Sequence, residues 1–143
     1  MCVPGLRQTA AVTMKIGVVS DTHNNLKNVT RIVELFNAAS VDLVVHTGDI
    51  TQAKTLDVFA NLAMPLTGVF GNNDVERESL DAAIARHGFR FTEAMLDTEL
   101  DSRRVAVIHD PFDLPSSLAP YDIVLHGHTH MRRIEQDDGR LVF

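Results

Sequence analysis

Five short motifs in this chain carry side chains that bind metal ions or transfer protons. They are Asp21-Thr22-His23, His46-Thr47-Gly48-Asp49, Gly71-Asn72-Asn73-Asp74, His109 and His126-Gly127-His128-Thr129-His130. Each motif lies at the carboxyl end of a short apolar run, and most include a glycine. Short buried strands that end in ligand-type residues are typical of one site built along a single edge of a sheet. The residue types predict that this site binds metal.

The donor atoms narrow the choice of metal. Asp supplies hard oxygen, His supplies borderline nitrogen and Asn supplies neutral oxygen, a mixture that suits Mn, Fe, Zn or Ni better than Ca or Mg. The one cysteine, Cys2, lies outside every motif. Neither a disulfide framework nor thiolate ligation is therefore available.

The spacing within the motifs predicts how ions could be shared. In an extended chain, residues two apart point to the same side, so Asp21 and His23 can bind one ion. His128 and His130 are also two apart, and each can reach a different ion. The glycine before Asp49 permits a tight turn that would place this carboxylate between two ions.

Hydrophobic periodicity predicts the elements that position the motifs. In the first half, strands are predicted at 14–20, 42–46 and 66–70. They alternate with three helices: a helical stripe from Leu26 to Phe36, and helices at about 51–63 and 75–87. Asn24 or Asn25 is predicted to cap the first helix, and Gly88 to close the third. This order predicts parallel strands. In the second half, strands are predicted at 89–91, 95–100, 103–109, 122–126 and 131–136, with a brief helix near 113–119 and a turn at 137–139 before a last strand.

Composition predicts one soluble domain. A chain of 143 residues, 45% hydrophobic, is long enough for one core and too short for two. Residues 1–13 show no periodicity and are expected to form a flexible extension, with a single domain at 14–143. The formal net charge of −6 offers no basic stripe for nucleic acid. No run approaches the roughly 18 apolar residues that span a bilayer, and no signal peptide is evident, so we expect a cytoplasmic protein without membrane contact.

The ordered motifs resemble those of the calcineurin-like metallophosphoesterase superfamily, whose pattern is D-x-H, G-D, G-N-H-E/D, a lone H and G-H-x-H. Gly71-Asn72-Asn73-Asp74 is most similar to the small bacterial and archaeal phosphodiesterases of that superfamily, in which G-N-C-D or G-N-N-D occupies this position. The resemblance covers about residues 14–136. It implies an α/β fold, a four-layer α/β/β/α sandwich with the site at the strand ends.

The resemblance also implies roles for seven residues. Asp21, His23 and His130 would hold a first ion, Asn72, His109 and His128 a second, and Asp49 would bridge them, with Asp49, Asn72 and His109 also acting in catalysis. Two divalent ions, with manganese favoured over nickel, iron or zinc, would activate a bridging water to attack a small phosphodiester. A phosphomonoesterase and a non-catalytic protein-interaction scaffold of the same fold remain alternatives, and a homo-oligomer stays open.

Three features depart from the family pattern. Asn73 stands where many phosphomonoesterases of the superfamily carry a catalytic His, which argues against strong monoesterase activity. Asp110 follows His109 where the family usually has Gly, and it could either add a ligand or narrow the pocket and repel phosphate. The chain ends at Phe143, where relatives usually continue through a further strand, so the usual C-terminal segment is expected to be missing.

Four other polar residues near the motifs have simpler explanations. His46 and His126 lie on apolar runs and are predicted to be core histidines, whose replacement by Gln should leave metal content near normal. His87 is predicted to be a residue at a helix C-terminus. Asp74 could support the ligands from behind or cap the helix at 75–87, and the sequence favours neither.

Overall fold

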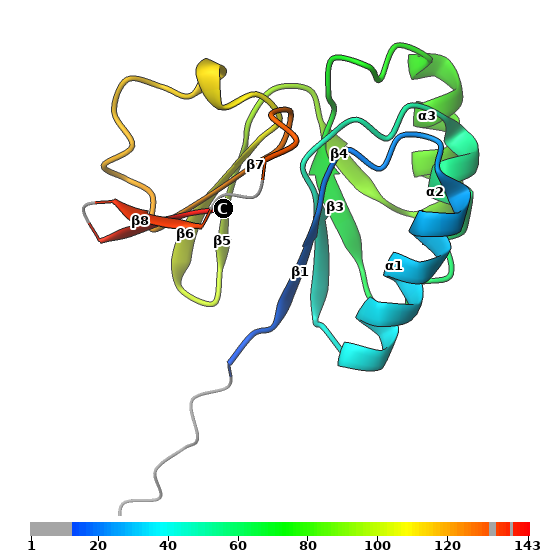
Figure 1. Cartoon of the computed structure of the whole chain (residues 1–143), viewed down its shortest axis with the longest axis horizontal. Coiled ribbons are helices and arrows are strands. Elements are labelled where there is room, and N and C mark those ends of the chain that lie inside the picture. Colours follow the sequence, from blue (N-terminus) through cyan, green and yellow to red (C-terminus); the bar gives the residue numbers. More distant parts are fainter. Residues whose placement is uncertain (1–12, 132–133, 138) are drawn as a thin grey trace, which may run out of the picture.

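The computed structural model describes residues 13–131, 134–137 and 139–143, which form two sheets and three α-helices (Figure 1). The first sheet has four parallel strands in the order β1-β2-β3-β4. Their bounds are Ile16–Val19 for β1, Leu43–His46 for β2, Leu66–Val69 for β3 and Arg90–Thr92 for β4. All four therefore end at the same edge.

The second sheet has five strands in the order β5-β6-β7-β9-β8. Their bounds are Leu96–Leu100 for β5, Arg103–Ile108 for β6, Ile123–His126 for β7, Glu135–Asp137 for β8 and Arg140–Val142 for β9. β6, β7 and β9 are parallel neighbours, whereas β5 and β8 pair antiparallel on the two flanks. The parallel pair β6 and β7 brings a second set of strand ends to one edge.

Three helices cover the face of the first sheet that is turned away from the second (Figure 1). They are α1 at Leu26–Ala39, α2 at Ala53–Phe59 and α3 at Arg77–His87. The Asn25 side chain caps α1 by accepting a hydrogen bond from the Asn28 N–H at 3.1 Å. Gly88 closes α3 at φ 71°, a left-handed conformation that glycine adopts without a Cβ clash. Both predicted ends are confirmed.

Alternating side chains divide the core into layers. On β2, Val44 packs under the helices, and its neighbour Val45 packs between the two sheets. Leu125 on β7 faces the same inter-sheet layer. Beyond the second sheet, Leu118 and Tyr121 of the loop after β6 cover its outer face. The predicted α/β fold with an α/β/β/α order of layers is confirmed, and this loop with a 3-10 helix supplies the last layer.

The structure corrects several predicted bounds. Helix α2 is shorter than the predicted 51–63, and the helix predicted near 113–119 is only a 3-10 turn at Pro111–Asp113. Pro115 explains the early end, because proline donates no N–H and restricts the residue before it. The strand predicted at 131–136 is observed at Glu135–Asp137. Residues 1–12, 132–133 and 138, which include most of the predicted extension and the middle of the predicted turn, lie outside the described residues.

Within the part of the chain that the structure describes, no helix combines the length and the apolar character that crossing a membrane requires.

Candidate metal centre

The seven predicted ligands come together where the strands of both sheets end. Loops after β1, β2 and β3 carry Asp21, His23, Asp49 and Asn72, and loops after β6 and β7 carry His109, His128 and His130. The packing of the two sheets on each other places these loops side by side. The site is therefore assembled across the interface between the sheets.

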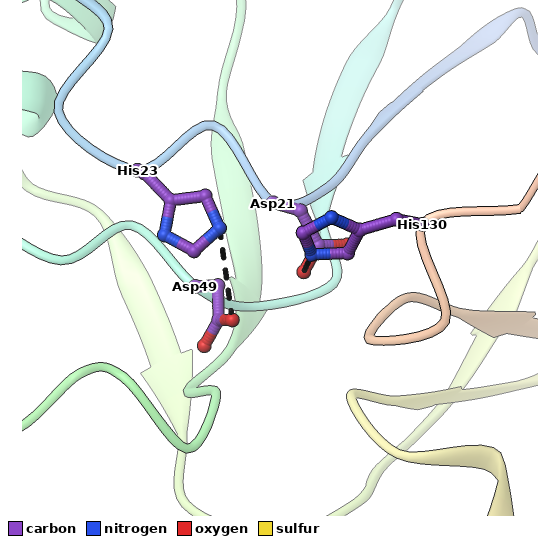
Figure 2. A group of neighbouring side chains, drawn as sticks. All are labelled: Asp21, His23, Asp49 and His130. Carbon is purple, nitrogen blue, oxygen red and sulfur yellow. Dashed lines mark ion pairs between the residues drawn. The ribbon is translucent and has the colours of Figure 1, made fainter.

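One group of side chains comprises Asp21, His23, Asp49 and His130, with one ligand atom of each within 4.8 Å of all the others (Figure 2). His130 Nε2 lies 3.3 Å from Asp21 Oδ1, and His23 Nε2 lies 3.9 Å from Asp49 Oδ2. Asp21 Oδ1 is buried and accepts no hydrogen bond from the described residues. A buried carboxylate oxygen in that position is costly unless a cation compensates it, so this group fits a metal ion.

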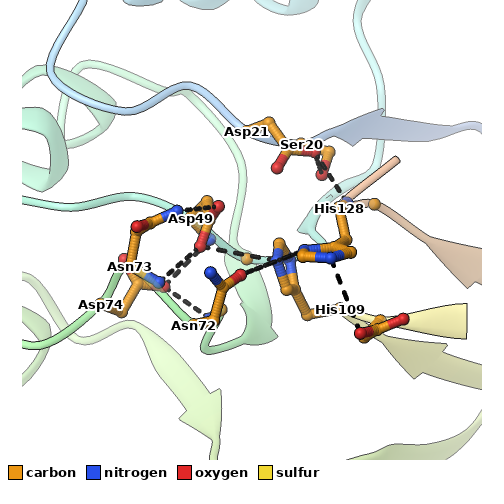
Figure 3. A network of polar contacts seen from close by, with 12 residues as sticks. Ser20, Asp21, Asp49, Asn72, Asn73, Asp74, His109 and His128 are labelled. Atoms are coloured by element: carbon orange, nitrogen blue, oxygen red, sulfur yellow. Dashed lines mark hydrogen bonds and ion pairs between the residues drawn. The ribbon is translucent and has the colours of Figure 1, made fainter. Parts of the chain in front are cut away.

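A second group comprises Asn72, His109 and His128, whose side chains point toward one another (Figure 3). Asn72 Oδ1 lies 2.8 Å from His109 Nε2 and 3.1 Å from His128 Nδ1, and the two nitrogens are 3.2 Å apart. Ligands at right angles around an ion, each about 2.0–2.2 Å from it, lie about 3 Å apart. The spacing of these three atoms therefore fits adjacent positions around one divalent ion.

The hydrogen bonding of His109 orients its free nitrogen toward this group. His109 Nδ1 lies 2.9 Å from the Thr47 carbonyl oxygen, which can only accept a hydrogen bond. The neutral ring therefore carries its proton on Nδ1 and presents a lone pair at Nε2. With the Asn72 amide in its present orientation, two lone pairs face each other, and a cation between them would turn this repulsion into attraction.

Asp49 belongs to the first group and also faces the second. Its Oδ1 is 3.5 Å from His109 Nε2, and its Oδ2 is 3.9 Å from His23 Nε2. Asn73 donates to both oxygens, from its backbone N–H at 2.9 Å and from its side-chain amide at 2.8 Å. Burial by itself raises the pKa of Asp49, but the two hydrogen bonds from Asn73, aided by the nearby histidines, outweigh it and leave the pKa below its usual value.

Asp74 ties the loops after β2 and β3 together (Figure 3). Its Oδ2 accepts from the backbone N–H groups of Asp49 at 3.0 Å and Gly71 at 2.7 Å, and its Oδ1 accepts from Thr51 N–H at 2.6 Å. Helix α3 begins after Glu76, so the alternative of Asp74 as its N-cap is wrong. Asp74 instead holds the backbone that carries Asp49 and Asn72.

His46 joins the loops after β1 and β2. It is fully buried, as expected for a core histidine. Its Nδ1 accepts from the Gly48 N–H at 3.0 Å, which leaves Nε2 to donate to Thr22 Oγ1 at 2.9 Å. Burial, reinforced by the nearby His109, lowers the pKa of His46 to about 3, so the ring stays neutral and keeps both bonds. This link was not predicted from the sequence, although a polar ring inside the motif that ends in Asp49 was a signal for it.

The backbone of the site differs from the extended chain assumed from the sequence. Asp21, His23, Asp49, His128 and His130 all have positive φ, between 46° and 70°. Residues other than glycine rarely adopt this left-handed region, and clusters of them mark functional sites. Alternation along a strand is therefore the wrong explanation for the shared direction of these side chains. Tight turns after β1, β2 and β7 aim them instead.

Asp110 does not join the second group of ligand atoms. Its Oδ2 lies 3.7 Å from His128 Nε2, the ring nitrogen opposite the one that faces Asn72 and His109. Its Oδ1 accepts from the Phe112 N–H at 2.9 Å and so caps the 3-10 helix. Asp110 thus stands behind His128, as carboxylates commonly do behind histidines that bind metals.

His126 and His87 lie apart from both groups. His126 is buried on β7, as predicted, with Nδ1 3.2 Å from the Gly127 carbonyl oxygen. His87 is the last residue of α3 and pairs with Asp57 at 2.7 Å.

Comparison with known proteins agrees with this geometry. Residues 14–143 match the calcineurin-like phosphoesterase superfamily domain. Phosphodiesterase MJ0936 of Methanocaldococcus jannaschii is 32% identical over 134 residues, which cover 90% of this chain and 81% of that protein. Phosphodiesterase YfcE of Escherichia coli K12 is 27% identical over 140 residues, which cover 86% of this chain and 73% of that protein.

Solved structures extend the comparison. A structure of an archaeal phosphodiesterase superposes with a TM-score of 0.79 at 32% identity, covering 90% of this chain and 81% of that one. Vps29 of Entamoeba histolytica, solved in complex with zinc, has a TM-score of 0.65 at 18% identity, covering 90% of this chain and 72% of that one. The second likeness concerns the fold alone.

The chain belongs to the calcineurin-like phosphoesterase superfamily. Together with the candidate ligands, this membership makes it a metal-dependent phosphoesterase, which is a hydrolase.

Proposed function

We propose that this protein hydrolyses phosphodiester bonds with two divalent metal ions, for which manganese is the first choice and nickel, iron and zinc are the alternatives. Asp21, His23 and His130 would hold the first ion, Asn72, His109 and His128 the second, and Asp49 both. The observation that carries the proposal is the position of Asp49, whose two oxygens face a His of each group at 3.5 and 3.9 Å. A carboxylate in this position can bind both ions at once.

When bound, such a pair of ions supplies Lewis-acid activation of water and of the phosphate ester. The residues of the chain contribute position and charge. Asn73 holds both oxygens of Asp49 and favours its ionised form. The His128 N–H and the Ser20 hydroxyl hold Asp21 Oδ2, at 3.1 and 2.5 Å, and so aim its other oxygen at the first group.

Two observations favour a diester over a monoester substrate. The side-chain amide of Asn73 is not an acid near neutral pH, and it is bound to Asp49, so it offers no proton to a poor leaving group. The two named relatives are phosphodiesterases. An interaction scaffold would have no need for seven ligand-type residues gathered into two adjoining groups.

The proposal is tested by removing metal with a chelator and restoring manganese, nickel, iron or zinc in turn. Elemental analysis should find two ions per chain. Turnover of bis(p-nitrophenyl) phosphate should return with metal and exceed that of p-nitrophenyl phosphate. One ion or none with metal in excess, or faster turnover of the monoester, would contradict it.

A further inference from the structure

A cavity of about 420 Å³ opens beside the second group of candidate ligands. Asn72 and His109, which belong to that group, form part of its wall. The remaining walls come from both halves of the chain: Phe70 and Arg77 on either side of the loop after β3, 93–95 between β4 and β5, and Ile108, Asp110 and Asp113 at and beyond the end of β6. Its volume lies within the range of about 300–1,000 Å³ typical of small-molecule sites. A group only a few bonds from a phosphorus atom bound at Asn72 and His109 would reach this cavity.

The charges on the cavity wall are unequal. Glu93, Asp110 and Asp113 contribute three carboxylates, and Arg77 contributes the one guanidinium. The guanidinium stacks on the Phe70 ring, with Cζ 3.7 Å from the ring centre, and its NH1 is hydrogen-bonded to Glu93. Arg77 is thus already paired, which leaves the carboxylates of Asp110 and Asp113 as the excess charge among the side chains of the wall.

We propose that this cavity receives one ester substituent of the phosphodiester and selects for positive charge over negative charge in it. The inference rests on the proposed function and adds a substrate class: diesters whose substituent is a small cationic or neutral group, such as an aminoalkyl or quaternary ammonium alcohol. The phosphate anion belongs at the metal ligands, and the substituent lies against the acidic wall. A substituent with its own phosphate or carboxylate would lie against the carboxylates of Asp110 and Asp113, whose negative charge no unpaired Arg or Lys of the wall offsets.

The alternative function for Arg77 is to bind an anionic substituent. Its pairing with Glu93 argues against this, because an anion would have to compete with a carboxylate that is already in place. The buried Arg77 Nε, which has no hydrogen-bond partner among the described residues, is closed to solvent and offers an incoming anion no donor.

The test uses three p-nitrophenyl diesters that share a leaving group and differ only in charge. Their second substituents are 2-(trimethylammonio)ethyl, its neutral isostere 3,3-dimethylbutyl, and 3-carboxy-3-methylbutyl. With the metal-loaded protein at low salt, kcat/KM should fall in that order, by about fivefold for each unit of charge. The spread should narrow near 1 M salt, where the Debye length is about 3 Å.

Variants of the cavity wall assign the preference to this place. The double variant Glu93→Gln with Asp113→Asn removes the excess negative charge and should make the three rates nearly equal. Arg77→Met keeps an apolar side chain over Phe70 but removes the one positive charge of the wall. The difference in kcat/KM between the cationic and the anionic diester should therefore widen by about fivefold. Glu99→Gln, a matched change on the exposed side of β5, should leave the ranking as in the wild type.

The outcomes separate this inference from the proposed function. The inference about the cavity is overturned if the three diesters are hydrolysed with equal kcat/KM values or in the reverse order. It is also overturned if the order persists unchanged in the wall variants. In each case the proposed phosphodiesterase activity still stands. If none of the diesters is hydrolysed, the proposed function fails, and calorimetric titration of the same compounds into the metal-loaded protein still decides whether the cavity prefers the cation. Equal affinities in that titration would overturn the inference as well.

Discussion

The two groups of candidate ligands differ in how closely their donor atoms approach one another. In the second group the three atoms lie 2.8–3.2 Å apart, and His109 is buried and held by the Thr47 carbonyl. In the first group the atoms spread over as much as 4.8 Å, and His130 has a side chain that is 61% exposed. Ligands already in place lose less freedom when an ion binds. We therefore expect the second group to bind its ion more tightly than the first.

The largest effect is expected from replacing Asp49, the carboxylate that both groups of ligands share. Asp49→Asn should lower the occupancy of both ions and reduce turnover by at least about 10³-fold, because the new amide is neutral and its NH₂ would face the Asn73 donors. Elemental analysis and diesterase assays measure the two effects. Asp57→Asn, on the exposed surface of α2, is the matched control and should keep both ions. Full metal content in Asp49→Asn would disprove the bridge.

Removing one His from each group tests the comparison directly. His130→Ala should weaken one ion by about 10–100-fold and leave the tighter ion in place. His109→Ala should instead remove the tighter ion. Titration of the metal-free proteins with manganese, followed by calorimetry, gives the two affinities for each variant. If His130→Ala removes the tighter ion, the order of the two groups is the reverse of the one expected.

The buried imidazole ring of His46 predicts that the stability of the fold depends on pH. In the folded state the pKa of His46 is about 3, whereas in the unfolded chain it has its ordinary value of about 6.5. Between these two pH values the unfolded chain binds a proton at His46 and the folded chain does not. The free energy of unfolding should therefore fall as pH is lowered from about 6.5, with this residue contributing up to about 1.4 kcal/mol per pH unit.

Urea unfolding of the metal-free protein between about pH 6.5 and 5.5 measures this slope, above most of the range in which carboxylates titrate. His46→Gln should be less stable near neutral pH and show a flatter dependence, by up to one proton. Equal slopes in the two proteins would show that His46 takes up its proton without unfolding.

The smallest effect on metal binding is expected from removing the hydroxyl group of Thr22. Thr22→Val keeps the shape of the side chain but removes the oxygen that accepts from His46, so the turn that carries Asp21 and His23 loses one of its links to the next loop and keeps the backbone hydrogen bonds to Gly48 and Asp49. We expect about tenfold weaker binding of the first ion and little change at the second. Thr67→Val, which removes a hydroxyl bonded to the Arg90 carbonyl away from the site, is the control. Equal weakening of both ions would mean that the two loops act as one unit.

Much of the fold was predictable because it depends on local sequence patterns. The alternation of apolar runs and helical stripes predicted β1 to β3 with α1 to α3 in order, and the cap residues Asn25 and Gly88 predicted two helix ends. The predicted helix near 113–119 was wrong because the apolar residues there cover the second sheet from a loop. Apolar spacing alone does not distinguish a helix from a loop that packs on a sheet.

For the site, the sequence by itself determined which residues end the strands, and parallel strands then bring those ends to one edge. Only the tertiary structure decided how they are aimed. The left-handed turns, the two links made by His46 and Asp74, and the acidic wall beside Asn72 all depend on contacts between loops that lie far apart in the chain. The same residue types would fit several such arrangements, and the packing of the two sheets selects one by fixing where each loop begins and ends.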